Sequence, residues 1–207
     1  PKGSGFPPMA NERILFMNSV KKIKEWLNTF TSFNEQEQVD CQRIRQFLEE
    51  EENLLLRDNV KMHFTASAWV LNPSKNKVLM LYHNIYQSWS WSGGHADGEG
   101  DLLSVAMKEV KEESGLVSLK PLSDSPISIE ILGVQPHYKK QKYVSAHLHL
   151  NYTFLLHNTK EEKLKICPEE NSKVGWLSPD EAVCSSTEAW MKPIYKKLNQ
   201  KMRKYLG

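Results

Sequence analysis

Apolar residues recur at the spacing of amphipathic helices along the first quarter of the chain. From Asn11 to about Asp58 the pattern is helical, with Ile23, Trp26 and Leu27 among the regularly spaced positions. Within it, residues 34–53 form a second helical pattern that ends in an acidic run, which is expected to be a solvated face or a fraying helix end. The pattern therefore predicts helices in succession before residue 60.

The hydrophobic period changes near Lys61, where strand-forming residues begin to dominate. Residues 63–71 and 77–82 are rich in strand formers, and the turn residues 72–76 between them predict a hairpin. Further strands are predicted at 127–135, 143–156 and 173–177.

Three more helices are predicted from capping residues and spacing. Asp101 can cap the start of a helix that Gly115 ends, and Ser178 opens another helix with a proline and a glutamate in its first turn. A basic helix follows at 188–205, and its positive charges are expected to lie on a solvated face: Lys196, Lys197, Lys201, Arg203 and Lys204. Together these elements predict an α/β (α+β) fold, a mixed β-sheet sandwiched between helices with an N-terminal helical extension.

The composition is that of an ordinary globular protein. The chain has 207 residues, of which 40% are hydrophobic and 25% are charged, which fits one main domain with an extension. Residues 1–10 have no periodicity and are interpreted as a tag or a disordered tail. Residues 11–60 are interpreted as a helical extension and residues 61–207 as the main domain.

Several classes of partner and cofactor are disfavoured. The net charge of +2 is too small for nucleic-acid binding through bulk electrostatics, and no apolar run reaches the roughly 18 residues of a membrane span. Cys41, Cys167 and Cys184 are far apart and lack CxxC spacing, which argues against both zinc and a disulfide framework. A reduced, cytoplasmic setting is expected.

The strongest chemical signal is a glycine-rich loop, residues 93–98, followed by an acidic helix. Glu112 and Glu113 follow Glu109 by three and four residues, so a helix places the three carboxylates on one face. Like charges at this spacing repel one another. Such a cluster suits Mg²⁺ or Mn²⁺, which prefer oxygen ligands and bridge to phosphate. A surface helix with a solvated acidic face is the alternative interpretation.

This stretch resembles the Nudix box of the Nudix hydrolases. The family pattern is glycine, five residues, glutamate, seven residues, Arg-Glu-apolar, one residue, Glu-Glu, one residue and Gly-apolar. The matching residues are Gly94, Glu109, Val110, Glu112, Glu113, Gly115 and Leu116, in order and without a gap. Two positions depart from the pattern: Gly100 stands at the first glutamate, and Lys108 stands at the arginine. Lysine keeps the charge of arginine but lacks its planar fork of donors.

The resemblance implies roles for these residues. The metal ligands that it implies, for Mg²⁺ or Mn²⁺, are Glu109, Glu112, Glu113 and the backbone carbonyl of Gly94. The same three glutamates and Lys108 are the implied catalytic residues. The general base is one of the glutamates or a glutamate of a later loop, for which Glu170 is the candidate, with Glu169 beside it.

The resemblance continues outside the box. Residues 63–68 look like the first strand of a Nudix subgroup, and residues 147–151 look like its His-x-His-x-Asp strand, with asparagine in place of aspartate. Strand alternation puts His147 and His149 on one face. These histidines, together with His95 in the loop, are expected to bind phosphate or substrate, and an exposed sheet face is the alternative.

Two functions are consistent with the sequence. The first is an Mg²⁺- or Mn²⁺-dependent hydrolase that cleaves the pyrophosphate bond of a nucleoside diphosphate linked to another moiety. The second is a non-catalytic Nudix domain that senses a nucleotide metabolite, which the departures at Gly100 and Lys108 favour. The expected partner is a small nucleotide-type molecule rather than nucleic acid or membrane. The helical extension could cover one side of the sheet, shape the substrate pocket or form a homodimer contact.

Overall fold

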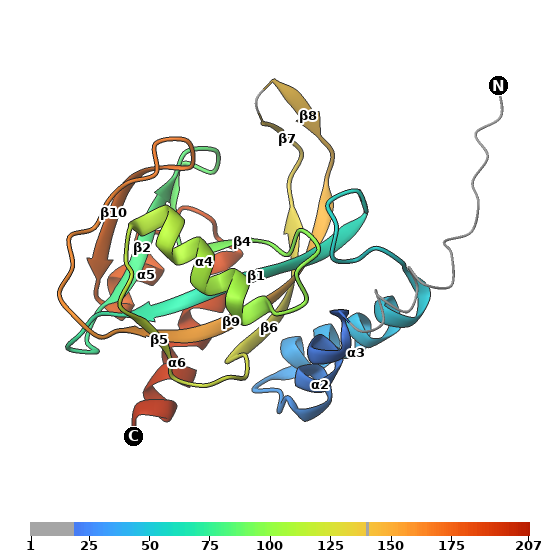
Figure 1. The fold of residues 1–207 in the computed structure, drawn as a ribbon, viewed down its shortest axis with the longest axis horizontal. Helices are drawn as coiled ribbons and strands as arrows, with labels where there is room; N and C mark the ends of the chain where they lie inside the picture. The colour runs from blue at the N-terminus through green and yellow to red at the C-terminus, as the bar shows by residue number, and fades with distance from the viewer. Residues whose placement is uncertain (1–18, 140) are drawn as a thin grey trace.

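A computed structural model of the chain describes residues 19–139 and 141–207 (Figure 1). The predicted tail at 1–10 and the first part of the predicted extension therefore lie outside the described residues. The helices are α2 (Lys21–Thr29), α3 (Glu35–Glu50), α4 (Leu102–Ser114), α5 (Pro179–Ser185) and α6 (Met191–Leu206). The strands are β1 (Met62–Leu71), β2 (Val78–His83), β3 (Ser88–Ser90), β4 (Ser92–His95), β5 (Leu119–Pro121), β6 (Ser128–Val134), β7 (His137–Lys139), β8 (Lys142–Val144), β9 (His147–Asn158) and β10 (Asn171–Leu177).

The strands form one mixed sheet and a small separate hairpin. The central path of the sheet runs β10-β2-β1-β9-β5, while β3, β4 and β6 pair with β2, β1 and β9 in turn. β1 and β9 are parallel, whereas β1 and β2 are antiparallel, with Leu71 opposite Val78. The predicted hairpin and the predicted mixed sheet are both confirmed.

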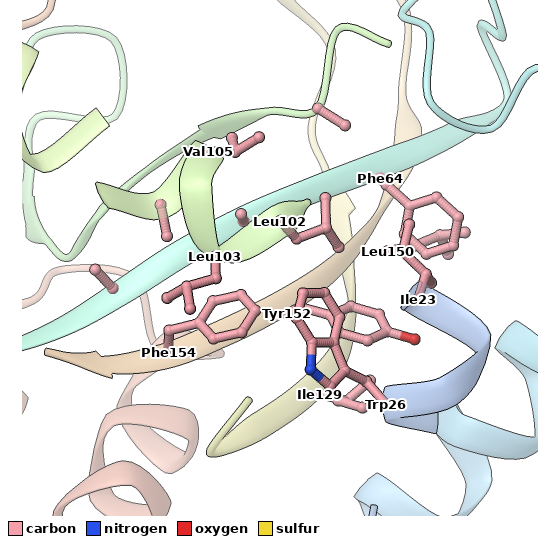
Figure 2. Packing of buried hydrophobic residues seen from close by; sticks show 14 of the residues in the cluster. Ile23, Trp26, Phe64, Leu102, Leu103, Val105, Ile129, Leu150, Tyr152 and Phe154 are labelled. Carbon is pink, nitrogen blue, oxygen red and sulfur yellow. The ribbon is translucent and has the colours of Figure 1, made fainter. Parts of the chain in front are cut away.

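One face of the central strands packs against α4 and the N-terminal helix α2. Alternation along β1 and β9 turns Phe64, Tyr152 and Phe154 to this face. Figure 2 shows the Trp26 side chain of α2 beside the rings of Tyr152 and Phe154, and its ring centroid lies 5.2 Å from that of Phe154. Its indole nitrogen donates to the carbonyl oxygen of Asp124 at 2.9 Å. Part of the predicted helical extension therefore covers the sheet.

The opposite face of the same strands has an apolar end and a polar end. At the apolar end, Trp69 and Leu71 pack against α6, whose Tyr195 stacks on Trp69 at a centroid distance of 5.4 Å. At the polar end, alternation turns His63 and Ser67 to the same side of β1. The polar end is where the functional residues gather.

The predicted boundaries hold closely in the helices and less closely around β8. α4 starts after its N-cap Asp101 and ends at Gly115, whose φ of 75° is the left-handed conformation of a helix C-cap. α5 has the predicted capping box at Ser178. The predicted strand 143–156 is split between the end of β8 and β9. In Figure 1 the β7–β8 hairpin projects away from the sheet.

A buried ion cluster joins α3, β6 and α6. The Nζ atom of Lys197 lies 3.1 Å from a carboxylate oxygen of Glu37 and 2.9 Å from one of Glu130. Lys201, one turn later, lies 2.5 Å from the same oxygen of Glu37. Burial acts to raise the pKa of Glu37, but the two lysines hold this pKa below its ordinary value.

The prediction that the lysines of the last helix form a solvated face is wrong for two of them. The side chains of Lys197 and Lys201 are only 4% and 9% exposed. Their partner Glu37 lies far away in the sequence, on another helix, so helical periodicity within α6 could not reveal the pairing. A buried charge without such a partner would be strongly destabilising. Because the partner could not be seen in the sequence, both lysines were predicted to be surface residues.

Candidate active site

Glu109 lies directly against the glycine-rich loop. A Cβ atom built on Gly94 would lie 2.3 Å from the Cδ atom of Glu109, so a side chain at position 94 would displace the carboxylate. The carboxylate is partly buried, and this burial raises its pKa, with further contributions from the charges of Glu112 and Glu170. Gly94 of β4 and Glu109 of α4, both residues of the box, are thus in direct contact.

Glu113 lies deeper, one turn further along α4, and is 4% exposed. Its Oε2 atom accepts hydrogen bonds from the hydroxyl of Ser92 and from the amide of Gly93, the latter at 3.2 Å. Burial raises the pKa of Glu113 to about 8 against the effect of these hydrogen bonds, and the charges of Glu109 and Glu170 add to the shift. The loop therefore holds the carboxyl group in one position, and its two hydrogen bonds only partly offset the effect of burial on the pKa.

This group of residues fits a hard divalent cation. The carboxylates of Glu109, Glu113 and Glu170 repel one another, and the raised pKa values report that repulsion together with burial. Gly94 has no side chain between the loop backbone and the Glu109 carboxylate, so backbone and carboxylate oxygens can lie close together. An all-oxygen donor set of this kind is what Mg²⁺ and Mn²⁺ prefer.

Lys108 and Glu112 occupy the exposed side of α4. Their side chains are 67% and 57% exposed, and the Nζ atom of Lys108 lies 3.8 Å from Oε1 of Glu112. A surface pair at this separation contributes little to stability. The structure brings Glu109 and Glu113 together at the loop, and it places Glu112 toward solvent, close enough to Glu109 to raise its pKa.

Glu170 reaches the same region from outside the helix, immediately before β10. The next residue, Asn171, donates a hydrogen bond from Nδ2 to the backbone carbonyl of Glu113 at 3.0 Å. This bond ties the start of β10 to the end of α4. Glu169 and Glu170 both line a cavity beside the helix glutamates, so both sequence candidates from this loop lie at the site.

Arg57 and Asp97 form a pair that the sequence did not indicate. The Nε atom of Arg57 lies 2.6 Å from Oδ1 of Asp97, and its terminal nitrogen donates to Oδ2. Asp97 belongs to the glycine-rich loop. Hydrogen bonding to Asp97 raises the pKa of Arg57, and the charges of Glu109 and Glu170 add to this shift. The guanidinium group of Arg57 therefore lies near these carboxylates, although the arginine position of the box is occupied by Lys108. Arg57 lies in irregular chain before β1, where no periodicity marks a site.

A cavity of about 670 Å³ opens beside the glutamates. This volume lies within the range of small-molecule sites. Five tyrosine and tryptophan side chains line it: Tyr86, Trp91, Tyr143, Trp190 and Tyr195. Tyr143 belongs to the β7–β8 hairpin, and Trp91 also packs edge-on against Tyr195 at a centroid distance of 5.4 Å. The cavity thus combines carboxylates with flat rings that could stack on a planar group.

Four histidines gather at the polar end of the sheet and line the same cavity. The ring centroid of His63 lies 5.0 Å from those of His95, His147 and His149. Burial, followed by the neighbouring histidines, lowers the pKa of His149 to about 2, and burial also lowers the pKa of His63. The three histidines expected from the sequence are thus brought together. His63 was missed as a site residue, although its place in an alternating strand puts it on the same face as Ser67.

Asn151 connects the histidine-bearing face to the buried ion cluster. Its Oδ1 atom accepts hydrogen bonds from Thr65 at 3.0 Å and from Ser67 at 2.8 Å, and its Nδ2 atom lies 3.3 Å from a carboxylate oxygen of Glu130. An amide can accept on one side and donate on the other, whereas an ionised aspartate can only accept. The asparagine at this position is therefore explained by the neighbouring Glu130.

Gly100, the first departure from the box, is packed against the N-terminal extension. A Cβ atom at this position would lie 1.8 Å from the backbone oxygen of Ser19, just before α2. The extension therefore takes the space that the glutamate of the family pattern would need. This arrangement explains the departure at Gly100.

We expect Gly100→Ala to destabilise the protein by about 1–3 kcal/mol, the usual cost of overpacking. The added methyl group must push Ser19 and the start of α2 off the box. Urea unfolding followed by circular dichroism measures the change. Gly133→Ala is the matched control, because a Cβ there meets nothing within 4 Å. Equal stability of the two variants would contradict the proposed contact.

Comparison with known proteins assigns the family. Residues 61–198 match the family model of the NUDIX domain. The chain therefore belongs to the Nudix family, and its predicted class, a Nudix hydrolase, is confirmed at this level. No curated protein matches the chain.

A solved structure supports the fold. The Ap4A hydrolase of C. elegans, in a binary complex, superposes with a TM-score of 0.51 at 18% identity, over 66% of this chain and 95% of that chain. The dihydroneopterin triphosphate pyrophosphohydrolase of E. coli gives a TM-score of 0.47 at 18% identity, over 65% and 92%. The first likeness supports the predicted Nudix-type α+β fold and nothing beyond it. Among the described residues, no helix combines the length and the apolar character needed to cross a membrane.

Proposed function

We propose that this protein hydrolyses a pyrophosphate bond in a nucleotide-type substrate with the help of Mg²⁺ or Mn²⁺. The observation that carries the proposal is the meeting of Glu109, Glu113 and Glu170 at the wall of the 670 Å³ cavity. The raised pKa values of Glu109 and Glu113 in a cleft are typical of a functional site. The aromatic residues of the cavity provide the complementary contact for a base.

The residues that would hold the metal are Glu109, Glu112, Glu113 and the backbone carbonyl of Gly94. When bound there, the ion would neutralise the diphosphate and increase the acidity of a water molecule. Glu113 is fixed by Ser92 and Gly93, so its carboxylate needs little reorganisation. Glu112 completes the set by a rotation of its exposed side chain.

The remaining residues position the substrate and move protons. Glu170 approaches the helix glutamates from a separate loop, and it acts as an additional ligand or as the base that accepts the proton of the attacking water. His95, His147 and His149 face the cavity and contact the phosphate groups or the sugar of the substrate. Lys108 balances the charge of Glu112 at the rim, at a distance of 3.8 Å.

The proposal is tested by measuring phosphate or nucleotide release from a panel of nucleoside diphosphate derivatives and dinucleotides, with Mg²⁺, with Mn²⁺ and with a chelator. Ap4A belongs in the panel because the C. elegans structure with the same fold is an Ap4A hydrolase. Metal-dependent turnover of at least one compound is expected. Thermal stabilisation by a compound without any product would instead support the alternative function, a Nudix domain that senses a nucleotide metabolite.

A further inference from the structure

A second group of potential metal ligands lies apart from the glutamates. Among the described residues, His63, His147 and His149 each offer a ring nitrogen, and these nitrogens all lie within 4.8 Å of one another. The parallel register of β1 and β9 places His63 beside His149, and His147 follows two residues earlier on the same face. Three strand positions on a rigid sheet therefore direct their rings to one point.

In two of these rings a backbone hydrogen bond at Nδ1 leaves the lone pair on Nε2. The Nε2 atom of His147 also faces Nε2 of His149 at 3.1 Å, a hydrogen bond that a bound metal would replace. The Nδ1 atom of His63 lies 3.2 Å from the carbonyl oxygen of Asn59, and that of His147 lies 2.8 Å from the carbonyl oxygen of Ser145. A carbonyl can only accept, so in both rings Nδ1 carries the proton and Nε2 carries the lone pair. A backbone carbonyl on the outer nitrogen is the usual support of a metal-binding histidine.

The Nε2 atom of His63 also points to a bound cation. It is buried and has no hydrogen-bond partner among the described residues. A buried polar atom in that state is costly, and a cation bound to its lone pair would remove the cost. The cysteine spacing argues against a zinc site with sulfur ligands. Cysteine ligands are not required here, because imidazole nitrogen alone suits zinc.

One nitrogen–nitrogen distance is close to that of a zinc site, and the others are at most 4.8 Å. Zn–N bonds of about 2.1 Å in a tetrahedron separate the nitrogens by about 3.4 Å, and the Nε2 atoms of His147 and His149 are 3.1 Å apart. Binding at His149 requires its Nδ1-protonated tautomer, which involves no net loss of a proton. Three protein ligands leave a fourth position that faces the cavity, the arrangement of a zinc ion that also binds a small molecule.

We infer that His63, His147 and His149 form a binding site for Zn²⁺, distinct from the glutamate cluster and open toward the cavity. The inference does not depend on the proposed hydrolysis, because it rests on the ring nitrogens and their outer hydrogen bonds. The ligand class for the fourth position is an anionic oxygen, such as a phosphate group.

The test is a calorimetric titration of the full chain, freed of metal by a chelator, with Zn²⁺ alone in buffer that contains excess Mg²⁺. One Zn²⁺ per chain with a Kd below about 1 μM is expected. His63→Gln and His149→Gln should weaken binding by at least about 100-fold. His157→Gln, a histidine on the same strand but outside the group, and Glu113→Gln should retain the wild-type affinity.

Co²⁺ substitution in the unmodified protein provides a second measurement that does not depend on the folding of a variant. Intense visible absorption bands of four-coordinate, nitrogen-bound Co²⁺ are expected, and they should disappear when Zn²⁺ is added. The inference is overturned by weak six-coordinate bands or by the absence of tight Zn²⁺ binding. Loss of Zn²⁺ binding in Glu113→Gln, with binding kept in folded His63→Gln, would also overturn it and would place the ion at the glutamates.

Discussion

Replacing Glu113 with glutamine should lower the metal-dependent hydrolysis rate by at least about 100-fold, the size of effect seen when one well-placed electrostatic contact is lost. Glutamine has the same shape and keeps an oxygen for the Ser92 and Gly93 donors, but it cannot supply the negative charge that holds the cation. Steady-state kinetics on the best substrate of the panel, at saturating Mg²⁺ or Mn²⁺, measures the change. Near-normal turnover in a folded Glu113→Gln protein would exclude Glu113 from the catalytic site.

The stability of the same variant separates a catalytic loss from unfolding. Burial raises the pKa of Glu113 from 4.5 to about 8, so between these pH values the unfolded chain gives up a proton that the folded metal-free protein keeps. The stability of the metal-free wild type should therefore fall as the pH rises through this window. Glu113→Gln should lose this contribution and be at least as stable as the wild type at pH 8. Glu161→Gln, on an exposed loop, is the control for both measurements.

Replacing Lys197 with methionine should cost about 3–5 kcal/mol of unfolding free energy, the usual penalty for removing one partner of a buried ion pair. Methionine fills the space of the lysine stem but leaves Glu130 without its cation, in a position that is 0% exposed. Urea unfolding at neutral pH measures the loss. Lys196→Met is the control, because the neighbouring lysine is exposed, and its effect should stay within about 0.5 kcal/mol.

A double variant distinguishes lost charge pairing from lost packing. Lys197→Met combined with Glu130→Gln removes the unpaired charge, so it should recover part of the stability. Failure of the second change to recover any stability would show that the cost of Lys197→Met arises from side-chain packing. A loss below about 1 kcal/mol for Lys197→Met alone would contradict a structural role for the cluster.

The parts of the fold that follow from local chemistry could be predicted from the sequence. Asp101 and Gly115 delimit α4 because a carboxylate caps the first turn and a glycine accepts the left-handed φ that ends it. The spacing from Gly94 to Glu113 could be recognised because the whole box lies in one continuous segment, the loop after β4 and the helix α4. The side-chain faces of β9 followed from its period of two.

The parts that depend on distant pairing could not be predicted. His63 joins His147 and His149 only because β1 and β9 lie side by side in parallel, and no sequence pattern specifies that register. Arg57 reaches Asp97 from an irregular segment, and Lys197 meets Glu37 from another helix. From the sequence, Gly100 was only a departure from the box. Its cause is steric, because the backbone of Ser19 occupies the space of a side chain at this position.

The parallel pairing of β1 with β9 also determines when the molecule can fold during synthesis. Thr65 and Asn151 are hydrogen-bonded across 86 residues of chain, and Lys201 reaches Glu37 across 164 residues. Contacts between such distant segments form slowly, because a long loop must close before they can stabilise anything. The centre of the sheet must wait for β9 to leave the ribosome. The charged face of α3 must wait longer, until α6 has emerged.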